Sequence, residues 1–171
     1  MTLSSLLLTS ILSLAVSTSS EINTAPLVND AIVNAPPEAV WKAWTTKEGI
    51  ESWMVAKTQI DLKVGAIWKT SYSKDSALDD DGSIHQQILS MDPGRMLSFR
   101  TVKSPKNFPY AEPIAKTWVV VYIDPAGEGK SRVTVKMLGF GEDALSQEMR
   151  SKFAAGNKYT VDKLVEKFGK G

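Results

Sequence analysis

Hydrophobic positions alternate with polar ones through the middle of the chain, a pattern typical of β-strands that bury one face. It predicts six strands, at residues 57–62, 66–72, 83–91, 95–102, 114–123 and 131–140. Most of these are separated by short turn-like segments rich in Asp, Gly and Pro, so neighbouring strands are expected to pair antiparallel. The exception is residues 103–113, an 11-residue loop with three prolines and two aromatic residues, Phe108 and Tyr110.

Helical patterns flank the strands. Residues 27–34 predict a first strand, and Pro36 and Pro37 then suit the start of a short helix. Thr45 followed by Glu48 has the form of a capping box and predicts a second short helix through residue 53.

A long amphipathic helix is predicted over residues 142–168, about 40 Å in length at 1.5 Å per residue. Its stripe recurs every three or four positions and comprises Leu145, Met149, Phe153, Gly156, Thr160, Leu164 and Phe168. Gly156 has two interpretations, which are close packing against the sheet and a bend that opens space beneath the helix.

Three motifs connect these elements to a known family. Residues 35–44 read Ala-Pro-Pro-Glu-Ala-Val-Trp-Lys-Ala-Trp, and Gly-Ile-Glu-Ser-Trp follows at 49–53. Residues 64–68 read Val-Gly-Ala-Ile-Trp, and residues 91–99 read Met-Asp-Pro-Gly-Arg-Met-Leu-Ser-Phe. In their order and spacing, residues 27–168 resemble the START-like (SRPBCC) superfamily, closest to the subfamily named after the activator of heat-shock-protein-90 ATPase. Ala66 stands where that subfamily has a second glycine.

This resemblance implies an α+β helix-grip fold. A curved antiparallel sheet of about seven strands would wrap on a long C-terminal helix, with two short helices after strand one. Because a twisted sheet does not lie flat against a helix, space remains between them. In the superfamily that space is typically an apolar cavity for lipids, polyketides or hormones.

The implied function is binding of a small hydrophobic ligand, with the proline-rich loop acting as a lid. Strand parity, the helical stripe and the resemblance place candidate ligand contacts at Trp53, Trp68, Tyr72, Phe99, Met137, Met149 and Phe153. The alternative for each of them is ordinary core packing.

The net charge and the residue types present limit the partners and reactions that we expect. Twenty Lys and Arg against nineteen Asp and Glu give a net charge of +1, so no nucleic-acid partner is expected. The chain has no Cys and one His, which excludes thiolate catalysis and Cys-ligated metal centres, and no metal or cofactor is expected. The Asp-Asp-Asp-Gly run at 79–82 does not fit a calcium loop, because Ala77 and Ile88 would fall where oxygen ligands are required.

An enzyme of the superfamily's cyclase or hydrolase type is the alternative function, with His85 and Tyr72 acting in the same cavity.

An apolar patch is predicted on the outer face of strand 114–123. Its outward positions are Trp118, Val120 and Tyr122, where a solvated sheet face should be polar. Contiguous exposed apolar surface often marks an interface, so a homodimer contact is one interpretation. Shielding by neighbouring side chains is the other.

The first 20 residues contain no charged side chain and include an apolar run at 6–16. Eleven residues are too few to span a bilayer, which needs about 20, but they fit the core of a secretory signal peptide. We therefore expect a signal peptide at 1–20 with a cleavage site at Ala15-Val16-Ser17, a linker at 21–26, a domain at 27–168, and a periplasmic or secreted protein. The alternative is an N-terminal extension, since no Lys or Arg precedes the run. Export would argue against an interaction with a cytosolic chaperone ATPase, the second alternative function.

Overall fold

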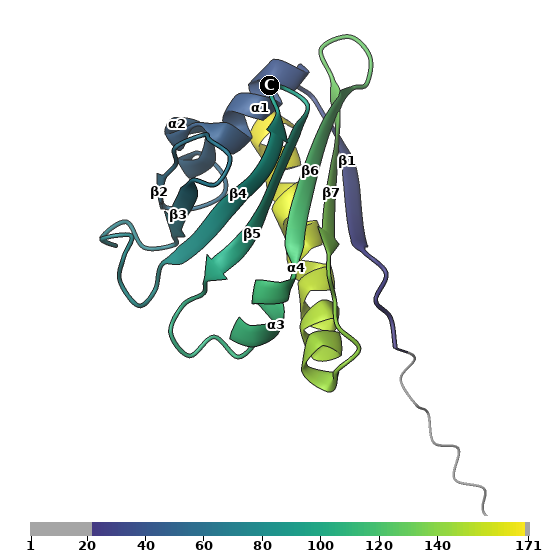
Figure 1. The fold of residues 1–171 in the computed structure, drawn as a ribbon. Coiled ribbons are helices and arrows are strands. Elements are labelled where there is room, and N and C mark those ends of the chain that lie inside the picture. Colours follow the sequence, from purple (N-terminus) through teal and green to yellow (C-terminus); the bar gives the residue numbers. More distant parts are fainter. Residues whose placement is uncertain (1–21, 170–171) are drawn as a thin grey trace, which may run out of the picture.

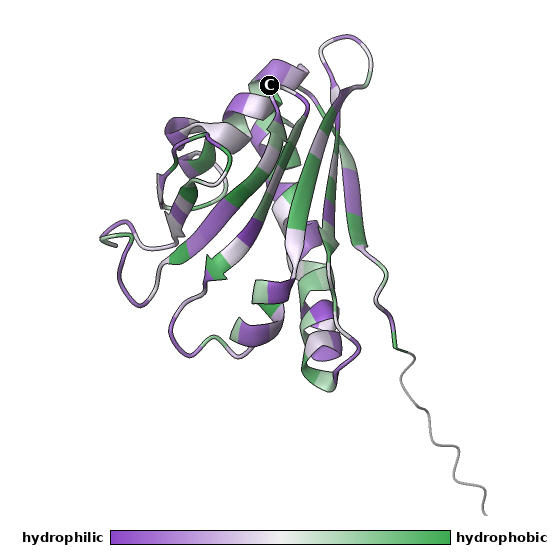
Figure 2. Ribbon diagram, in the orientation of Figure 1, coloured by the Kyte–Doolittle hydropathy of each residue, from purple (hydrophilic) through white to green (hydrophobic). Residues whose placement is uncertain are grey.

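The computed structural model describes residues 22–169 and confirms the α+β helix-grip fold (Figure 1). One antiparallel sheet of seven strands has the order β1-β7-β6-β5-β4-β3-β2. Its strands are β1 (Leu27–Val33), β2 (Lys57–Gln59), β3 (Ile67–Ser71), β4 (Ile84–Asp92), β5 (Met96–Lys103), β6 (Trp118–Pro125) and β7 (Ser131–Leu138). Figure 2 shows polar and apolar residues alternating along these strands, as the sequence pattern predicts.

The sheet curves around the long helix α4 (Ala144–Gly169), while α1 (Pro37–Thr45) and α2 (Lys47–Glu51) cover one end of the same face (Figure 1). The tight turn between α1 and α2 depends on Gly49, because a Cβ atom there would lie 2.1 Å from the Lys42 carbonyl oxygen. The cap of α2 differs from the prediction. The hydroxyl of Thr46, not of Thr45, accepts a hydrogen bond of 3.0 Å from the Gly49 amide.

A second difference lies after the proline-rich loop. Residues 114–116, predicted as the start of a strand, belong instead to the short helix α3 (Ala111–Lys116), and β6 begins at Trp118. The bond from the Thr117 amide to the Ile114 carbonyl closes this helix. Two apolar residues in a row, Ile114 and Ala115, fit both a strand and a single helical turn. Periodicity over so few residues therefore does not distinguish the two structures.

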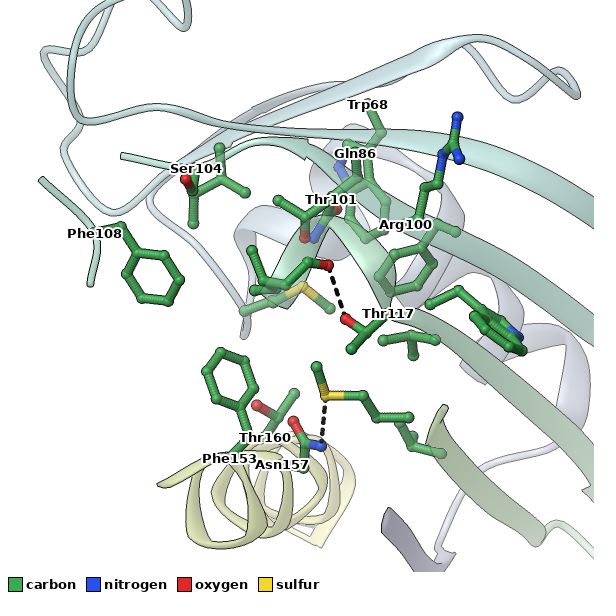
Figure 3. Close-up of a pocket in the computed structure, with 18 of the residues that line it drawn as sticks. Trp68, Gln86, Arg100, Thr101, Ser104, Phe108, Thr117, Phe153, Asn157 and Thr160 are labelled. Carbon is green, nitrogen blue, oxygen red and sulfur yellow. Dashed lines mark hydrogen bonds between the residues drawn. The ribbon is translucent and has the colours of Figure 1, made fainter. Parts of the chain in front are cut away.

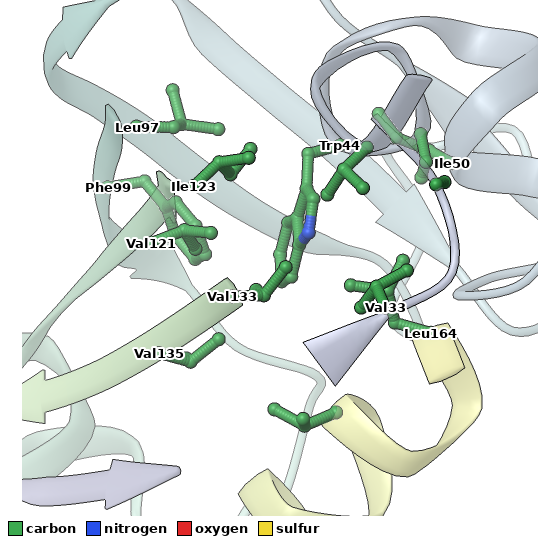
Figure 4. Close-up of a cluster of buried hydrophobic side chains, with 14 of the residues drawn as sticks. Val33, Trp44, Ile50, Leu97, Phe99, Val121, Ile123, Val133, Val135 and Leu164 are labelled. Atoms are coloured by element: carbon green, nitrogen blue, oxygen red, sulfur yellow. The ribbon is translucent and has the colours of Figure 1, made fainter. Parts of the chain in front are cut away.

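The core between sheet and helices is divided into two clusters. The larger one lies under α1 and the C-terminal half of α4 and is shown in Figure 4. It includes Val33, Trp44, Ile50, Val133 and Leu164. The smaller one lies at the other end of α4 and consists of Leu27, Met137, Phe140 and Met149.

Helix α4 is buried at both ends and not in the middle. Ser146 and Met149 are buried near its start, and Val161 and Leu164 near its end. Asp143 caps the start by accepting bonds from the Ser146 amide (2.9 Å) and hydroxyl (2.6 Å), which lowers the pKa of its carboxyl group.

Gly156, in the unburied middle of α4, is exposed, and a Cβ atom there would meet nothing within 4 Å. This excludes close packing against the sheet as its role. The inward side chains of this stretch are Phe153, Asn157 and Thr160, which are all only half-buried.

The predicted linker is partly tied to the domain. Gln147 on α4 bonds through its side chain to the amide and carbonyl of Asn23, and the Arg150 guanidinium donates to the Ala25 carbonyl. The predicted signal peptide lies outside the described residues. Within residues 22–169, none of the helices combines the length and hydrophobicity needed to cross a membrane.

Candidate functional site

A cavity of about 410 Å³ lies between the concave face of the sheet and the middle of α4 (Figure 3). It occupies the space between the two core clusters, where α4 carries no fully buried side chain. Apolar and aromatic groups make most of its surface, namely Trp44, Met54, Trp68, Phe99, Phe108, Ile114, Val119, Val135, Met137 and Phe153. Its polar lining includes Gln86, Thr101, Ser104, Thr117, Asn157 and Thr160.

Two aromatic rings build the sheet wall of the cavity. Trp68 on β3 and Phe99 on β5 meet edge to face, with ring centroids 5.1 Å apart. The Trp68 indole nitrogen donates a hydrogen bond of 2.8 Å to the Thr58 hydroxyl, which in turn donates to the Lys69 carbonyl. Trp68 is thus fully buried with its polar atom satisfied, and its ring forms a fixed wall of the cavity.

The opposite wall comes from α4. Phe153, Asn157 and Thr160 are spaced four and three residues apart and therefore share one face of the helix. The Asn157 amide nitrogen lies 3.5 Å from the Met137 sulfur, a direct contact between α4 and β7 (Figure 3). The hydroxyl of Thr160 donates back to the Gly156 carbonyl.

The loop between β5 and α3, residues 104–110, closes one side of the cavity. Phe108 packs edge to face with Phe153 (6.5 Å between centroids) and with Tyr110 (5.7 Å). The Tyr110 hydroxyl donates to Glu148 on α4, and this bond raises the pKa of the tyrosine. The other flank of the loop is tied to residues 76–83, where the Lys106 amide donates to the Asp81 carbonyl.

Five of the seven predicted ligand contacts line this cavity: Trp68, Tyr72, Phe99, Met137 and Phe153. Trp53 and Met149 do not. The indole nitrogen of Trp53 donates to the Ala43 carbonyl, and its ring packs edge to face on Trp44. Met149 lies one helical turn before Phe153, fully buried in the smaller core cluster.

Tyr72 lies at the rim rather than inside. It follows the last residue of β3, and 75% of its surface is exposed. Desolvation, with a smaller contribution from Tyr159, raises the pKa of its phenol above the usual value. The prediction assumed that β3 continues through residue 72, where alternation would point the side chain inward. The strand ends at Ser71, so alternation does not set the direction of Tyr72.

Gln86 is a lining residue that sequence analysis did not identify. It pairs in register with Trp68 on one side and Thr101 on the other, which places its side chain on the concave face. Its carboxamide oxygen is buried and accepts no hydrogen bond from any residue in the range 22–169. A register shift between His85 and Gln86 means that simple alternation along the strand does not predict which face Gln86 occupies.

The indole nitrogen of Trp44 is likewise buried without a partner among the described residues, within the packed cluster of Figure 4.

His85 points to the opposite face from Gln86. Its Nε2 atom lies 2.7 Å from the Leu78 carbonyl oxygen and 3.6 Å from the Asp79 carboxylate. This holds the 76–83 turn on the outer face of the sheet and keeps His85 out of the cavity lining. The turn is organised by Asp80, which accepts from Ser76 and from the amides at 77 and 82. In residues 22–169, no group of three or more His, Asp or Glu side chains is placed to hold a metal ion.

The predicted patch lies on β6, where Trp118 also borders the cavity. Trp118 and Tyr122 are 38% and 39% exposed, and Val120 between them is half-buried. The Lys136 ammonium lies 5.5 Å from the centre of the Tyr122 ring and covers part of it.

Comparison with known proteins agrees with this architecture. The family described as Activator of Hsp90 ATPase homolog 1-like protein matches residues 34–169. No curated protein sequence is significantly similar to the chain.

Solved structures share the fold at low sequence identity. The protein MLL2253 from Mesorhizobium loti is 20% identical, with a TM-score of 0.66 over 84% of this chain and 96% of the other. The Aha1 dimer from Colwellia psychrerythraea, determined in solution, is 16% identical, with a TM-score of 0.66 over 86% and 99%. DynU16, from the dynemicin biosynthetic locus, is 18% identical, with a TM-score of 0.64 over 85% and 48%. The match across residues 34–169 shows that the chain belongs to the Activator of Hsp90 ATPase homolog 1-like family, within the START-like superfamily.

Proposed function

We propose that this protein binds a small hydrophobic ligand, of the lipid or polyketide type, in the cavity between the sheet and α4. The observation that carries the proposal is the gap of about 410 Å³ beneath the middle of α4, where a packed core would otherwise continue. Its size lies within the range of about 300–1,000 Å³ that is usual for small-molecule sites, and its surface is mostly apolar. The family's fold commonly holds hydrophobic molecules, which supports the same conclusion.

The 104–110 loop would control access to this ligand. Phe108 and Pro105 form part of the cavity wall. Opening would break the Phe108–Phe153 contact, the Tyr110–Glu148 bond, the bonds between Lys106 and Asp81, and the packing of Tyr110 against the smaller core cluster.

Binding is tested with N-phenyl-1-naphthylamine, whose fluorescence rises in apolar surroundings. The wild-type protein should give a saturable increase. The variant Thr160→Phe, which places a ring into the cavity, should weaken binding at least about tenfold. Ala155→Phe adds the same ring on the exposed face of α4 and should bind like wild type. No saturable signal in the wild type, or equal loss in both variants, would contradict the proposal.

The enzymatic alternative needs a base other than His85, since that side chain bonds to the 76–83 turn outside the cavity. A measured turnover that is abolished by His85→Ala would nevertheless favour catalysis.

The second alternative is an interaction with a chaperone ATPase, which the family's name describes. Co-purification with a cytosolic chaperone, together with an intact N-terminus, would support it.

We also propose that the protein is exported. The uncharged start of the chain, its apolar run at 6–16 and the Ala15-Val16-Ser17 site support cleavage there. The mass of the protein recovered from its source organism should correspond to a chain beginning near Thr18. A mass that includes Met1 would contradict export by this route.

We further propose a homodimer formed through Trp118, Val120 and Tyr122. The exposure of Trp118 and Tyr122 supports it, as does the dimeric state of the Colwellia relative. Sedimentation should show a dimer that Tyr122→Glu dissociates. Tyr159→Glu, at another exposed tyrosine, should leave it intact. A wild-type monomer at high concentration would refute the dimer.

A further inference from the structure

Most polar groups of the cavity wall are already used within the protein. The hydroxyls of Thr117 and Thr160 donate to backbone carbonyls, and the Trp68 indole nitrogen donates to a hydroxyl on β2. The Asn157 amide nitrogen lies against a methionine sulfur. The Gln86 carboxamide oxygen is enclosed by protein atoms, so a molecule in the cavity does not reach it. Most donors of the wall are therefore not available to a ligand.

Two hydroxyls at the end of β5 differ from these groups. Thr101 lies two residues after Phe99 and therefore on the same concave face, and Ser104 begins the loop that closes the cavity. Both residues line the cavity and are half-buried. Figure 3 shows no hydrogen bond between either hydroxyl and another lining residue drawn there. The two hydroxyls thus make one end of the cavity polar.

The wall beyond these hydroxyls is apolar. Register places Phe99 and Met137 in one row across β5, β6 and β7 on the concave face. Val135 and Trp44, which also line the cavity, belong to the larger core cluster. A bound molecule would therefore meet hydroxyl groups at the end of β5 and apolar side chains toward β7 and the core.

The charged side chains near this wall are directed elsewhere. Arg100 is the one charged residue among the described residues that line the cavity, but it is exposed and its guanidinium donates a bond of 3.0 Å to Gln87. Lys103, the other basic residue of β5, donates to two backbone carbonyls of the 76–83 turn and to the Ser83 hydroxyl. An ionised ligand would be buried without a counter-charge, which is strongly unfavourable.

We propose that the cavity binds uncharged amphipathic molecules in one orientation, with a polar head group bonded to the Thr101 hydroxyl and an apolar body against Phe99 and Met137. The inference rests on the ligand-binding function proposed above and names its substrate class. Thr101 is the specificity-determining residue rather than Ser104, because Thr101 is held in register with Gln86 on β4. Ser104 lies in the loop that would open to admit the ligand.

Three biphenyls of similar size test the proposal by displacement of N-phenyl-1-naphthylamine: 4-hydroxybiphenyl, 4-methylbiphenyl and biphenyl-4-carboxylate. Wild-type protein should bind the carboxylate at least about tenfold more weakly than 4-hydroxybiphenyl. Thr101→Val keeps the shape of the side chain and removes its hydroxyl. It should weaken 4-hydroxybiphenyl about tenfold, the loss expected for one buried hydrogen bond, and leave 4-methylbiphenyl unchanged or tighter. Thr134→Val makes the same change on the outer face of β7 and should alter none of the three affinities.

The orientation is measured by intermolecular nuclear Overhauser effects in the complex with 4-hydroxybiphenyl. The ring that carries the hydroxyl should contact the Thr101 methyl group, and the unsubstituted ring should contact the Met137 methyl group. The reverse pattern, or contacts of both rings with both methyl groups, would overturn the proposed orientation.

The outcomes separate the two proposals. If N-phenyl-1-naphthylamine itself does not bind, the ligand-binding function fails and the selectivity fails with it. If it binds, but Thr101→Val affects 4-hydroxybiphenyl and 4-methylbiphenyl equally or the carboxylate binds as well as 4-hydroxybiphenyl, the cavity takes apolar molecules without the selectivity proposed here. Thr101→Ser retains the hydroxyl and should bind 4-hydroxybiphenyl like wild type. Thr101→Ala provides a second variant without the hydroxyl if Thr101→Val does not fold.

Discussion

Two adjacent parts of the concave face are built from the same sheet and the same helix, yet they differ: the part under α1, here called the filled end, is packed, and the part under the middle of α4, here called the hollow end, is empty up to the smaller core cluster. At the filled end, Trp44 from α1 lies among Val33, Val133 and Leu164 (Figure 4). At the hollow end Phe153, Asn157 and Thr160 of α4 face the cavity, and Ile114 of the short helix α3 also lines it. The difference shows that Trp44 of α1 and Ile50 of α2 fill the space between the sheet and α4 at the filled end, whereas α3 leaves it open at the hollow end.

The inward face of α4 differs in the same way between its two parts. At the filled end it presents Val161 and Leu164, both buried. Over the cavity it presents two polar residues, Asn157 and Thr160, and one half-buried ring. Residues in a packed core stabilise the fold, whereas residues that face a cavity contribute less to stability and are available for recognition.

The largest effect is expected at the filled end. Leu164→Ala removes a fully buried side chain from close-packed surroundings and should lower the free energy of unfolding by about 3 kcal/mol. Urea unfolding measures it. A loss under about 1 kcal/mol would show that the filled end is as loosely packed as the hollow one.

A smaller effect is expected at the hollow end, although the side chain removed is larger. Phe153→Ala should cost only about 1 kcal/mol, because one face of the ring already borders empty space. The same variant should weaken N-phenyl-1-naphthylamine binding, since it removes part of the wall and the contact with Phe108. A loss of stability as large as that of Leu164→Ala would contradict the proposed division.

The smallest effect is a gain in stability. Asn157→Leu should stabilise the protein by about 0.5 kcal/mol, because Leu is the better helix former and the amide makes only a weak contact with the Met137 sulfur. Thermal unfolding reports the change. A destabilised variant would mean that the Asn157 amide is needed in the folded protein.

The sequence predicted the fold better than the site, and particular residues show why. Trp68, Phe99 and Met137 lie on regular strands, where alternation fixes the inward face. Trp53 is on no strand, and its direction depends on a bond to the Ala43 carbonyl that no periodicity contains. Met149 lies on the predicted face of α4, but Leu27, Met137 and Phe140 pack around it in the smaller core cluster, and periodicity along α4 does not show where that cluster ends and the cavity begins.

Polar lining residues were the hardest to predict. A search for apolar stripes passes over Gln86, and the register shift beside it obscures its parity. On α4, the stripe drawn through Gly156 missed Asn157, although 153, 157, 160 and 164 follow the same helical spacing. Polar residues such as Gln86 and Asn157, at positions whose spacing places them on the inward face, therefore indicate a cavity. The hydrophobic pattern alone does not reveal it.

The methionines offer the most direct measurement of the central claim, that the hollow end is the ligand site. The chain has six, of which Met54 and Met137 line the cavity while Met91, Met96 and Met149 lie elsewhere in the fold. Methionine methyl NMR during titration with N-phenyl-1-naphthylamine distinguishes these positions, because the rings of the probe shift nearby resonances. The account predicts saturable shifts of Met54 and Met137 with Met96 unchanged. Shifts of Met96 without those of Met137, or no shift at any methionine, would contradict it.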